Sequence, residues 1–335
     1  MTILPRHGEL LGLVLAGTPA PICPVFAHHH HPAADQDAGM LADATLAWQA
    51  RFDLDLVKLT PASTWQLRDY GVEDAPDPAD ALGRRRITRT IVETMSDWGR
   101  LPLLNPGGGF AARIVAATRL IRRRLPAGIP LLTTLYGPAS LAVKLAPPGM
   151  FDRHRHADPN AVAQGLAILT ENCRRLVTAL ADAGADGIFL AVQTARKPLF
   201  TADDYASLCL SGDLACLAAA SALPFNILHL HGDGIHHELF ATARQALLHY
   251  DPSPGNPAPE SLLASRGSLS TGPRPDGAIT HGTAARCTDE VAGLLARLKG
   301  PGFVLAPGCS LPLSVPAANL DMLVQMARTP RHDRP

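Results

Sequence analysis

The sequence has no net charge, because its 30 lysine and arginine residues are matched by 30 aspartate and glutamate residues among 335. Proteins that bind nucleic acid usually carry a basic face or stripe. Here lysine is scarce and the arginines are scattered, apart from two short runs at residues 84–86 and 122–124 that fit solvated helix faces. We therefore expect no nucleic-acid partner.

Long apolar runs are also missing. No stretch reaches the roughly 18 residues that a membrane-spanning helix needs. Near the N-terminus, Glu9 interrupts a short apolar patch whose charges are placed wrongly for a signal peptide. The six cysteines show neither a Cys-x-x-Cys pair nor the spacing of a disulfide framework. These absences predict a cytoplasmic, reduced protein with no membrane partner.

What the sequence does contain is an alternation of strand-like and helix-like segments. Apolar runs predict eight strands, at residues 22–27, 54–60, 129–136, 187–192, 225–231, 246–250, 267–271 and 302–307. Periodic segments predict helices at residues 8–17, 39–52, 111–125, 158–185, 289–300 and 315–328. Such alternation is typical of an α/β domain, and eight strands predict a (β/α)8 TIM barrel formed by residues 1–335 as one domain. Residues 8–17 are expected to pack across one end of this barrel.

A doubly wound open sheet is the alternative fold. It would favour an early glycine-rich phosphate turn, and the glycines at residues 105–110 (NPGGGF) do not follow the GxGxxG pattern. Residues 65–110 lack a strong period, and we interpret them as an insertion after the second strand. We interpret the proline-rich residues 251–266 as a long loop on the active-site face.

Reactive side chains gather at the predicted carboxyl ends of the strands, where TIM barrels hold their active sites. His229 and His231 share one face of their strand, because side chains alternate with period two. The other residues at strand ends are His28, His30, Tyr136, Gln193, His249, Asp251 and Cys309. We expect these side chains to converge on one mouth of the barrel.

Two imidazoles and a thiolate suggest a zinc site, and a catalytic zinc leaves one coordination position open. His229, His231 and Cys309 could supply the three ligands, since strands on opposite sides of a small barrel both reach its centre. A hydrogen-bonded pair of core histidines would explain the His-x-His pair equally well by itself. The Pro-Gly-Cys turn that carries Cys309 favours the metal.

The chain resembles the uroporphyrinogen decarboxylase superfamily, and within it the zinc-dependent cobalamin:thiol methyltransferase branch. The resemblance covers most of the chain and also implies a (β/α)8 barrel. The similar segments are ICPVF (22–26), ARFDLDLVKLTP (50–61), LLTTLYGPASLA (131–142), GADGIFLAVQ (184–193), LHLHGD (228–233) and GFVLAPGCSLPLSVPAANLDMLVQMAR (302–328), the last being the most specific.

In this branch an H-x-C pair and a late cysteine hold zinc, which binds a thiol as thiolate. Carried over, these positions are His229, His231 and Cys309. His231 stands where the family has cysteine, which makes the metal a stronger Lewis acid and a bound thiolate less nucleophilic. The resemblance implies a zinc-dependent methyl or alkyl transferase that acts on a small-molecule thiol, with methylcobalamin or a corrinoid protein as donor. A homodimer is compatible with the sequence.

The remaining strand-end residues receive supporting roles. Asp251 or His249 is the expected fourth metal ligand by its position, and Asp251 is alternatively a general base. The residues expected to contact the substrate are His28, His30, Tyr136, Gln193 and His249.

Other activities stay open at this point. Because His231 changes the family's ligand set, a zinc-dependent lyase or decarboxylase is the second interpretation, and a non-catalytic binder of metal or corrinoid is the third. The decarboxylase itself uses an arginine after its first strand and an aspartate at the end of its second. Residues 28–32 (HHHHP) hold no arginine and residues 60–64 (TPAST) no acid, so decarboxylation of a porphyrinogen is not expected.

Overall fold

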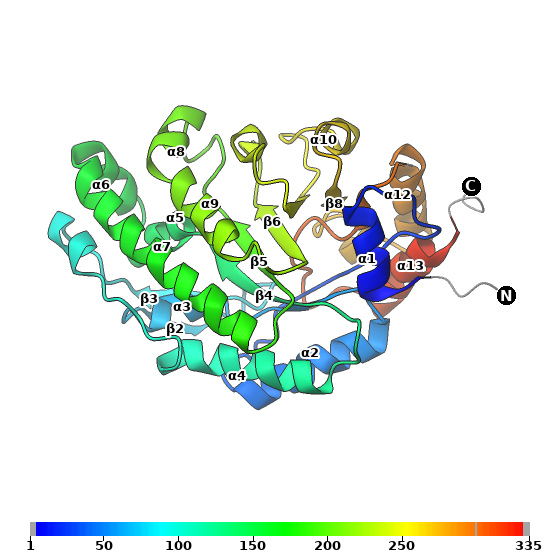
Figure 1. Ribbon diagram of the computed structural model, residues 1–335, viewed down its shortest axis with the longest axis horizontal. Coiled ribbons are helices and arrows are strands. Elements are labelled where there is room, and N and C mark those ends of the chain that lie inside the picture. Colours follow the sequence, from blue (N-terminus) through cyan, green and yellow to red (C-terminus); the bar gives the residue numbers. More distant parts are fainter. Residues whose placement is uncertain (1–4, 299, 331–335) are drawn as a thin grey trace.

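The computed structural model describes residues 5–298 and 300–330. A curled parallel sheet of seven strands runs through the molecule with helices packed around it (Figure 1). In hydrogen-bonding order the strands are β1 Val57–Leu59, β4 Leu131–Tyr136, β5 Gly187–Val192, β6 Asn226–Leu230, β7 Ala246–Tyr250, β8 Leu269–Thr271 and β9 Phe303–Leu305. The fold is therefore α/β and barrel-like. Among the described residues, no helix is both long and apolar enough to cross a bilayer.

Seven of the eight predicted strands are confirmed, and the first is not a strand. Residues 22–27 form a single parallel bridge, between Val25 and Leu305. Phe26 N donates to Leu305 O, and Asp55 N donates to Val25 O, so this segment lies between β9 and β1. Pro24 has no N–H to donate, which explains why the segment does not extend into a ladder.

The predicted helices are confirmed with small shifts at their ends. They are α1 His7–Leu15, α2 Ala38–Phe52, α4 Gly109–Arg124, α7 Pro159–Asp182, α12 Ala284–Arg297 and α13 Ala317–Arg328. Residue 299 of the predicted helix 289–300 lies outside the described residues, as do residues 1–4 and 331–335 of the predicted domain. The Asp158 side chain accepts hydrogen bonds from the first turn of α7, and Pro159 occupies the first helical position.

Several short helices were not predicted. These are α5 Pro138–Leu145, α6 Met150–Ala157, α8 Ala202–Leu208, α9 Leu210–Ala219, α10 Pro259–Arg266, α11 Ala278–His281 and the 3-10 turn η2 His237–Phe240. Most have eight residues or fewer, too few for a clear helical period. Helix α10 occupies the second half of residues 251–266, so only its first half is an irregular loop.

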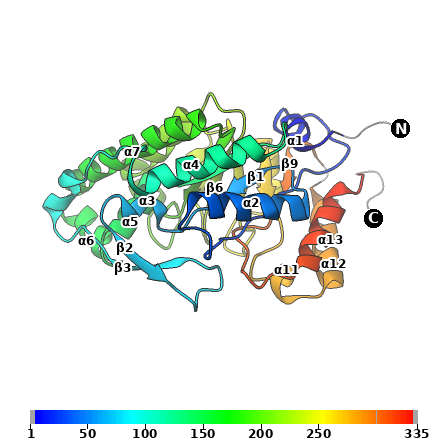
Figure 2. The ribbon, with the colours of Figure 1, turned by 90° about the horizontal axis from the view of Figure 1, so that it is seen from below.

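Residues 65–110 contain regular structure that their composition did not predict. They form α3 Trp65–Arg68, an antiparallel pair of strands, β2 Glu73–Pro76 and β3 Arg85–Arg89, and the 3-10 turn η1 Met95–Arg100. The pair projects from one side of the molecule (Figure 2). Asp74 is buried at its base and accepts hydrogen bonds from Arg68 Nε at 2.9 Å and Arg85 Nε at 2.8 Å. The interpretation of this segment as an insertion stays a prediction.

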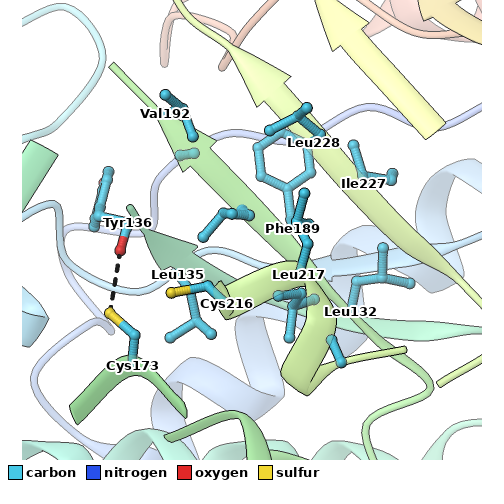
Figure 3. Close-up of a cluster of buried hydrophobic side chains, with 14 of the residues drawn as sticks. Leu132, Leu135, Tyr136, Cys173, Phe189, Val192, Cys216, Leu217, Ile227 and Leu228 are labelled. Atoms are coloured by element: carbon cyan, nitrogen blue, oxygen red, sulfur yellow. Dashed lines mark hydrogen bonds between the residues drawn. The ribbon is translucent and has the colours of Figure 1, made fainter. Parts of the chain in front are cut away.

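The hydrophobic core takes residues from both faces of neighbouring strands. Leu132 and Leu135 of β4, Phe189 and Val192 of β5, and Ile227 and Leu228 of β6 belong to one cluster with Leu217 of α9 (Figure 3). These side chains are at most 2% exposed. Because these side chains fill the interior, polar side chains gather at the carboxyl ends of the strands.

Asp55 ties together three parts of the chain at the amino end of the sheet. Its side chain is 1% exposed and accepts hydrogen bonds from Val25 N at 2.9 Å and His7 N at 3.1 Å. Arg328 of α13 forms an ion pair with the same carboxylate. Gly8 N donates to Gly128 O, just before β4, so α1 crosses this end of the sheet as predicted.

We predict that Asp55→Ala lowers the free energy of unfolding by about 3 kcal/mol, because it leaves the Arg328 guanidinium without its partner and two backbone N–H groups unsatisfied. Urea unfolding monitored by circular dichroism measures the change. Asp321→Asn is the control, since Asp321 pairs with Arg51 at the surface, and we expect it to cost less than about 1 kcal/mol. Equal effects of the two substitutions would show that Asp55 does not hold the segments together.

Candidate metal centre

Seven of the nine predicted site residues line one cavity of about 460 Å³ at the carboxyl ends of the strands. These residues are His28, His30, Tyr136, Gln193, His229, His231 and Cys309. They come from five separate segments of the chain, as expected for the active-site end of a barrel. His249 and Asp251 do not line this cavity.

His229, His231 and Cys309 form a cluster with the dimensions of a metal site. Cys309 Sγ lies 3.6 Å from His229 Nε2 and 3.4 Å from His231 Nδ1, and the three ligand atoms are all within 4.8 Å of one another. Nitrogen and sulfur ligands held tetrahedrally around zinc are roughly 3.3–3.8 Å apart, given bonds of about 2.0–2.3 Å. The side chains present therefore fit zinc and need little movement to bind it.

The ends of β6 and β9 place these ligands. His229 is the fourth residue of β6, and His231 N donates to Val192 O at 3.0 Å, which continues the pairing with β5 for one residue. Cys309 lies in the turn after β9. The preceding Gly308 packs directly on Asp251, because a Cβ at this glycine would lie 2.6 Å from Asp251 Cα. Only glycine allows the turn to approach β7 so closely.

A chain of hydrogen bonds fixes the tautomer of His229. His249 Nε2 lies 2.9 Å from Pro307 O, a carbonyl that can only accept, so Nε2 carries the proton. Burial lowers the pKa of His249 to about 3, which keeps this ring neutral and leaves Nδ1 with a lone pair. His229 Nδ1, 2.9 Å away, must then donate to His249 Nδ1. His229 Nε2 is left as a free lone pair that points toward Cys309.

The surroundings of the cluster keep both of its imidazoles neutral. Burial, together with His249, His231 and Lys58, lowers the pKa of His229 well below its ordinary value. Burial lowers the pKa of His231 to about 4. Both imidazoles are therefore neutral at physiological pH, the form that binds a metal.

His249 lies behind His229 rather than at the cavity surface. Its ring is 0% exposed, and both ring nitrogens are used by His229 and Pro307. This placement does not bring it to a substrate or to a fourth ligand position. His249 instead orients the ring of His229, as the outer hydrogen-bond partner of a metal-binding histidine would.

Asp251 lies beside the Cys309 turn, outside the three-residue cluster. Its Oδ1 is 3.9 Å from Arg274 Nε, and burial raises the pKa of its carboxyl to about 6. The structure does not bring it to the ligand atoms of the cluster. The roles of fourth ligand and general base stay predictions for this residue.

The histidine run at residues 28–31 divides between two environments. His28 and His30 face the cavity, where His30 Nδ1 donates to Pro61 O at 3.2 Å and His28 Nδ1 is buried without a protein partner. His29 packs on Trp48 of α2, with ring centroids 4.1 Å apart. Alternate residues of the run thus contact the cavity and the surrounding helices.

Tyr136 and Gln193 line the wall between α5 and β5. Tyr136 N donates to Gln66 Oε1 at 2.7 Å, and Gln193 N donates to Ser140 Oγ at 2.8 Å. These bonds hold the backbone and leave the two side chains free to face the cavity. Substrate contact by these side chains stays a prediction.

Six cationic residues that line the cavity were not among the predicted site residues: Lys58, Arg84, Arg85, Arg86, Lys144 and Arg196. Lys58 Nζ lies 4.3 Å from the centroid of the Phe189 ring, and Lys144 Nζ lies 4.2 Å from that of Tyr136. Burial lowers their pKa values, to about 7 for Lys58 and about 8 for Lys144. A lysine in the middle of the apolar run LDLVKLT was the signal that could have identified Lys58.

These features agree with a known family. A family model described as uroporphyrinogen decarboxylase (URO-D) matches residues 23–330. The chain belongs to the uroporphyrinogen decarboxylase family. The resemblance predicted from the sequence segments is thereby confirmed at the level of the superfamily. A comparison with curated proteins gave no match.

Solved structures of other proteins have a similar fold. A methyltransferase from Methanosarcina mazei is 18% identical, with a TM-score of 0.83 over 96% of this chain and 98% of its own. A B12-independent methionine synthase from Shewanella sp. W3-18-1, in complex with selenomethionine, is 14% identical, with a TM-score of 0.54 over 92% and 97%. A putative vitamin B12-independent methionine synthase from Listeria monocytogenes is 12% identical, with a TM-score of 0.55 over 94% and 98%.

We predict that His249→Phe lowers the zinc affinity of the purified protein by about 10- to 100-fold, because His229 loses the acceptor that fixes its tautomer. Competition with a chromophoric chelator measures the affinity. His30→Phe is the matched control, because His30 is a buried cavity imidazole that hydrogen-bonds to Pro61 O and not to a residue of the cluster. An unchanged zinc affinity in a folded His249→Phe protein would contradict the assigned role.

Proposed function

We propose that this protein is a zinc-dependent alkyl transferase that methylates or otherwise alkylates a thiol substrate. The observation that carries the proposal is the cluster of His229, His231 and Cys309 at the wall of an open cavity. Three protein ligands leave one coordination position for a substrate, which is the arrangement of a catalytic rather than a structural zinc site.

Zinc held by these residues supplies Lewis acidity that lowers the pKa of a thiol at the open position. The protein's own contribution is to present the ligands in the correct form. His249 keeps the lone pair of His229 Nε2 directed at the cavity. His28, His30, Tyr136 and Gln193 line the space next to the cluster and would orient the rest of the substrate.

The comparisons support a transferase, because the similar structures include proteins described as a methyltransferase and as methionine synthases. The sequence resemblance adds the donor, methylcobalamin or a corrinoid protein that docks at the cavity mouth. A ligand set of two histidines and one cysteine carries one negative charge fewer than the family's two cysteines and one histidine. Zinc in this ligand set would therefore donate less electron density to a bound thiolate, which makes the sulfur a weaker nucleophile. It would lower the pKa of the bound thiol more strongly.

The same ligand set supports a second candidate, a zinc-dependent lyase or decarboxylase acting on a small molecule. A metal with fewer thiolate ligands polarises a carbonyl or carboxylate oxygen more strongly. The two candidates differ in what they require. The transferase needs a thiol and an alkyl donor, whereas the lyase needs neither, and a non-catalytic binder would hold metal without turnover.

We predict that the zinc-loaded protein forms a methyl thioether from methylcobalamin and a small thiol, detected by mass spectrometry. Removing zinc with a chelator should abolish the product and adding zinc should restore it. Cys309→Ala should reduce the rate by at least about 100-fold, since it removes a ligand. Cys287→Ala is the control, because Cys287 is buried in a hydrophobic cluster with Val291 and Leu323 and does not line the cavity. No thioether from any tested thiol and donor, with the site fully loaded, would reject the proposal.

A further inference from the structure

Lys58 is an unusual residue for the middle of a barrel strand. It belongs to β1, is 8% exposed, and lines the cavity. Its amine hydrogen-bonds with Thr60 Oγ1 at 3.3 Å and lies over the face of the Phe189 ring at 4.3 Å. His229 of the cluster contacts the same Phe189 ring, with centroids 5.2 Å apart. The amine and this histidine thus share one aromatic neighbour.

Within residues 5–298 and 300–330, no carboxylate compensates this buried amine. Burial lowers its pKa, and the Cys309 sulfur opposes this shift. The titratable groups that its charge affects lie on the surrounding segments and are His28, His30, His229, His249 and Cys309. A lysine held without a counter-charge in an apolar setting exists readily as the neutral amine, which is a base.

The cavity histidines and the second cavity lysine suit this task less well. Burial lowers the pKa of His30 to about 3 and that of His28 well below its ordinary value. Both nitrogens of His249 are already bonded. Lys144 lies on α5 over Tyr136, and its charge contributes to lowering the pKa of His231. Burial lowers the pKa of Lys144 only to about 8, so its amine is neutral less readily than that of Lys58.

We propose that Lys58 is the base that accepts the proton of the thiol substrate, an inference that rests on the proposed thiol alkylation. The S–H bond breaks and an N–H bond forms at Lys58 Nζ, with no change in oxidation state. A C–S bond then forms as the donor's leaving group departs with its bonding electron pair. The neutral thioether leaves, and the Lys58 ammonium returns its proton to solvent, which restores the amine.

The number of protons released on thiol binding tests this assignment without any turnover. The cobalt(II)-loaded protein is titrated with 2-mercaptoethanol at about pH 7.5, below the pKa of a free thiol. Binding is followed by sulfur-to-cobalt absorption, and proton release by calorimetry in buffers of different ionisation enthalpy. In the wild type the proton stays on Lys58, so we expect release close to zero. Lys58→Arg keeps the positive charge but cannot accept a proton, so we expect about one proton released per thiol bound.

Controls separate this proposal from the one on which it rests. Lys58→Met, which lacks both charge and base, should also release about one proton, and it replaces the arginine variant if the larger side chain does not fit. Lys144→Arg should keep the wild-type value. If wild-type protein binds no thiol, the proposed function fails. If thiol binds and Lys58→Arg releases no more protons than the wild type, only the role of Lys58 is overturned.

Discussion

One hydrogen bond between two buried imidazoles decides what the cavity can bind. Because Pro307 O accepts from His249, the facing nitrogen of His249 must accept from His229, and the far nitrogen of His229 is left as a lone pair beside Cys309. With the opposite tautomer, His229 would present an N–H to the cluster and could not bind a metal. The hydrogen bond between His229 and His249 is therefore compatible with metal binding by His229. It is this bond that leaves His229 Nε2 free to bind a metal.

The sheet produces this arrangement through its register. His229 and His249 are paired residues on the neighbouring strands β6 and β7, so their side chains point into the barrel at one level. The turn after β9 reaches the same level because Gly308 allows it to pack on Asp251. The resulting cluster offers one sulfur and two nitrogens, and the nearby Lys58 adds an amine with no carboxylate partner among the described residues. This cluster carries less negative charge than the family's usual ligand set. A side chain that accepts the proton of the thiol would therefore assist the reaction.

Much of this could be predicted from the sequence, and the failures have physical causes. Apolar runs identified seven strands and the ends at which ligands gather, because burial and strand length leave a local signal. Residues 22–27 failed because Pro24 breaks the pairing that their apolar character favours. The short helices carried too few turns to show a period. His249 was predicted at the correct end of its strand. Whether its imidazole faces the cavity or the ring of His229 depends on the register between β6 and β7, and this register cannot be predicted from a local sequence pattern. Lys58 was passed over because a lysine in a strand can extend its amine to solvent, and only the surrounding fold shows that this one does not.

The most direct test of the account is the zinc content of the purified protein, measured by inductively coupled plasma mass spectrometry after loading and gel filtration. We expect about one zinc per chain in the wild type and in Cys287→Ala. His229→Ala and Cys309→Ala should both lose the zinc, while circular dichroism shows that they remain folded. A wild-type protein that takes up no metal, or variants that retain it, would contradict the metal centre. The histidine cluster would then have to act as a structural or acid–base device.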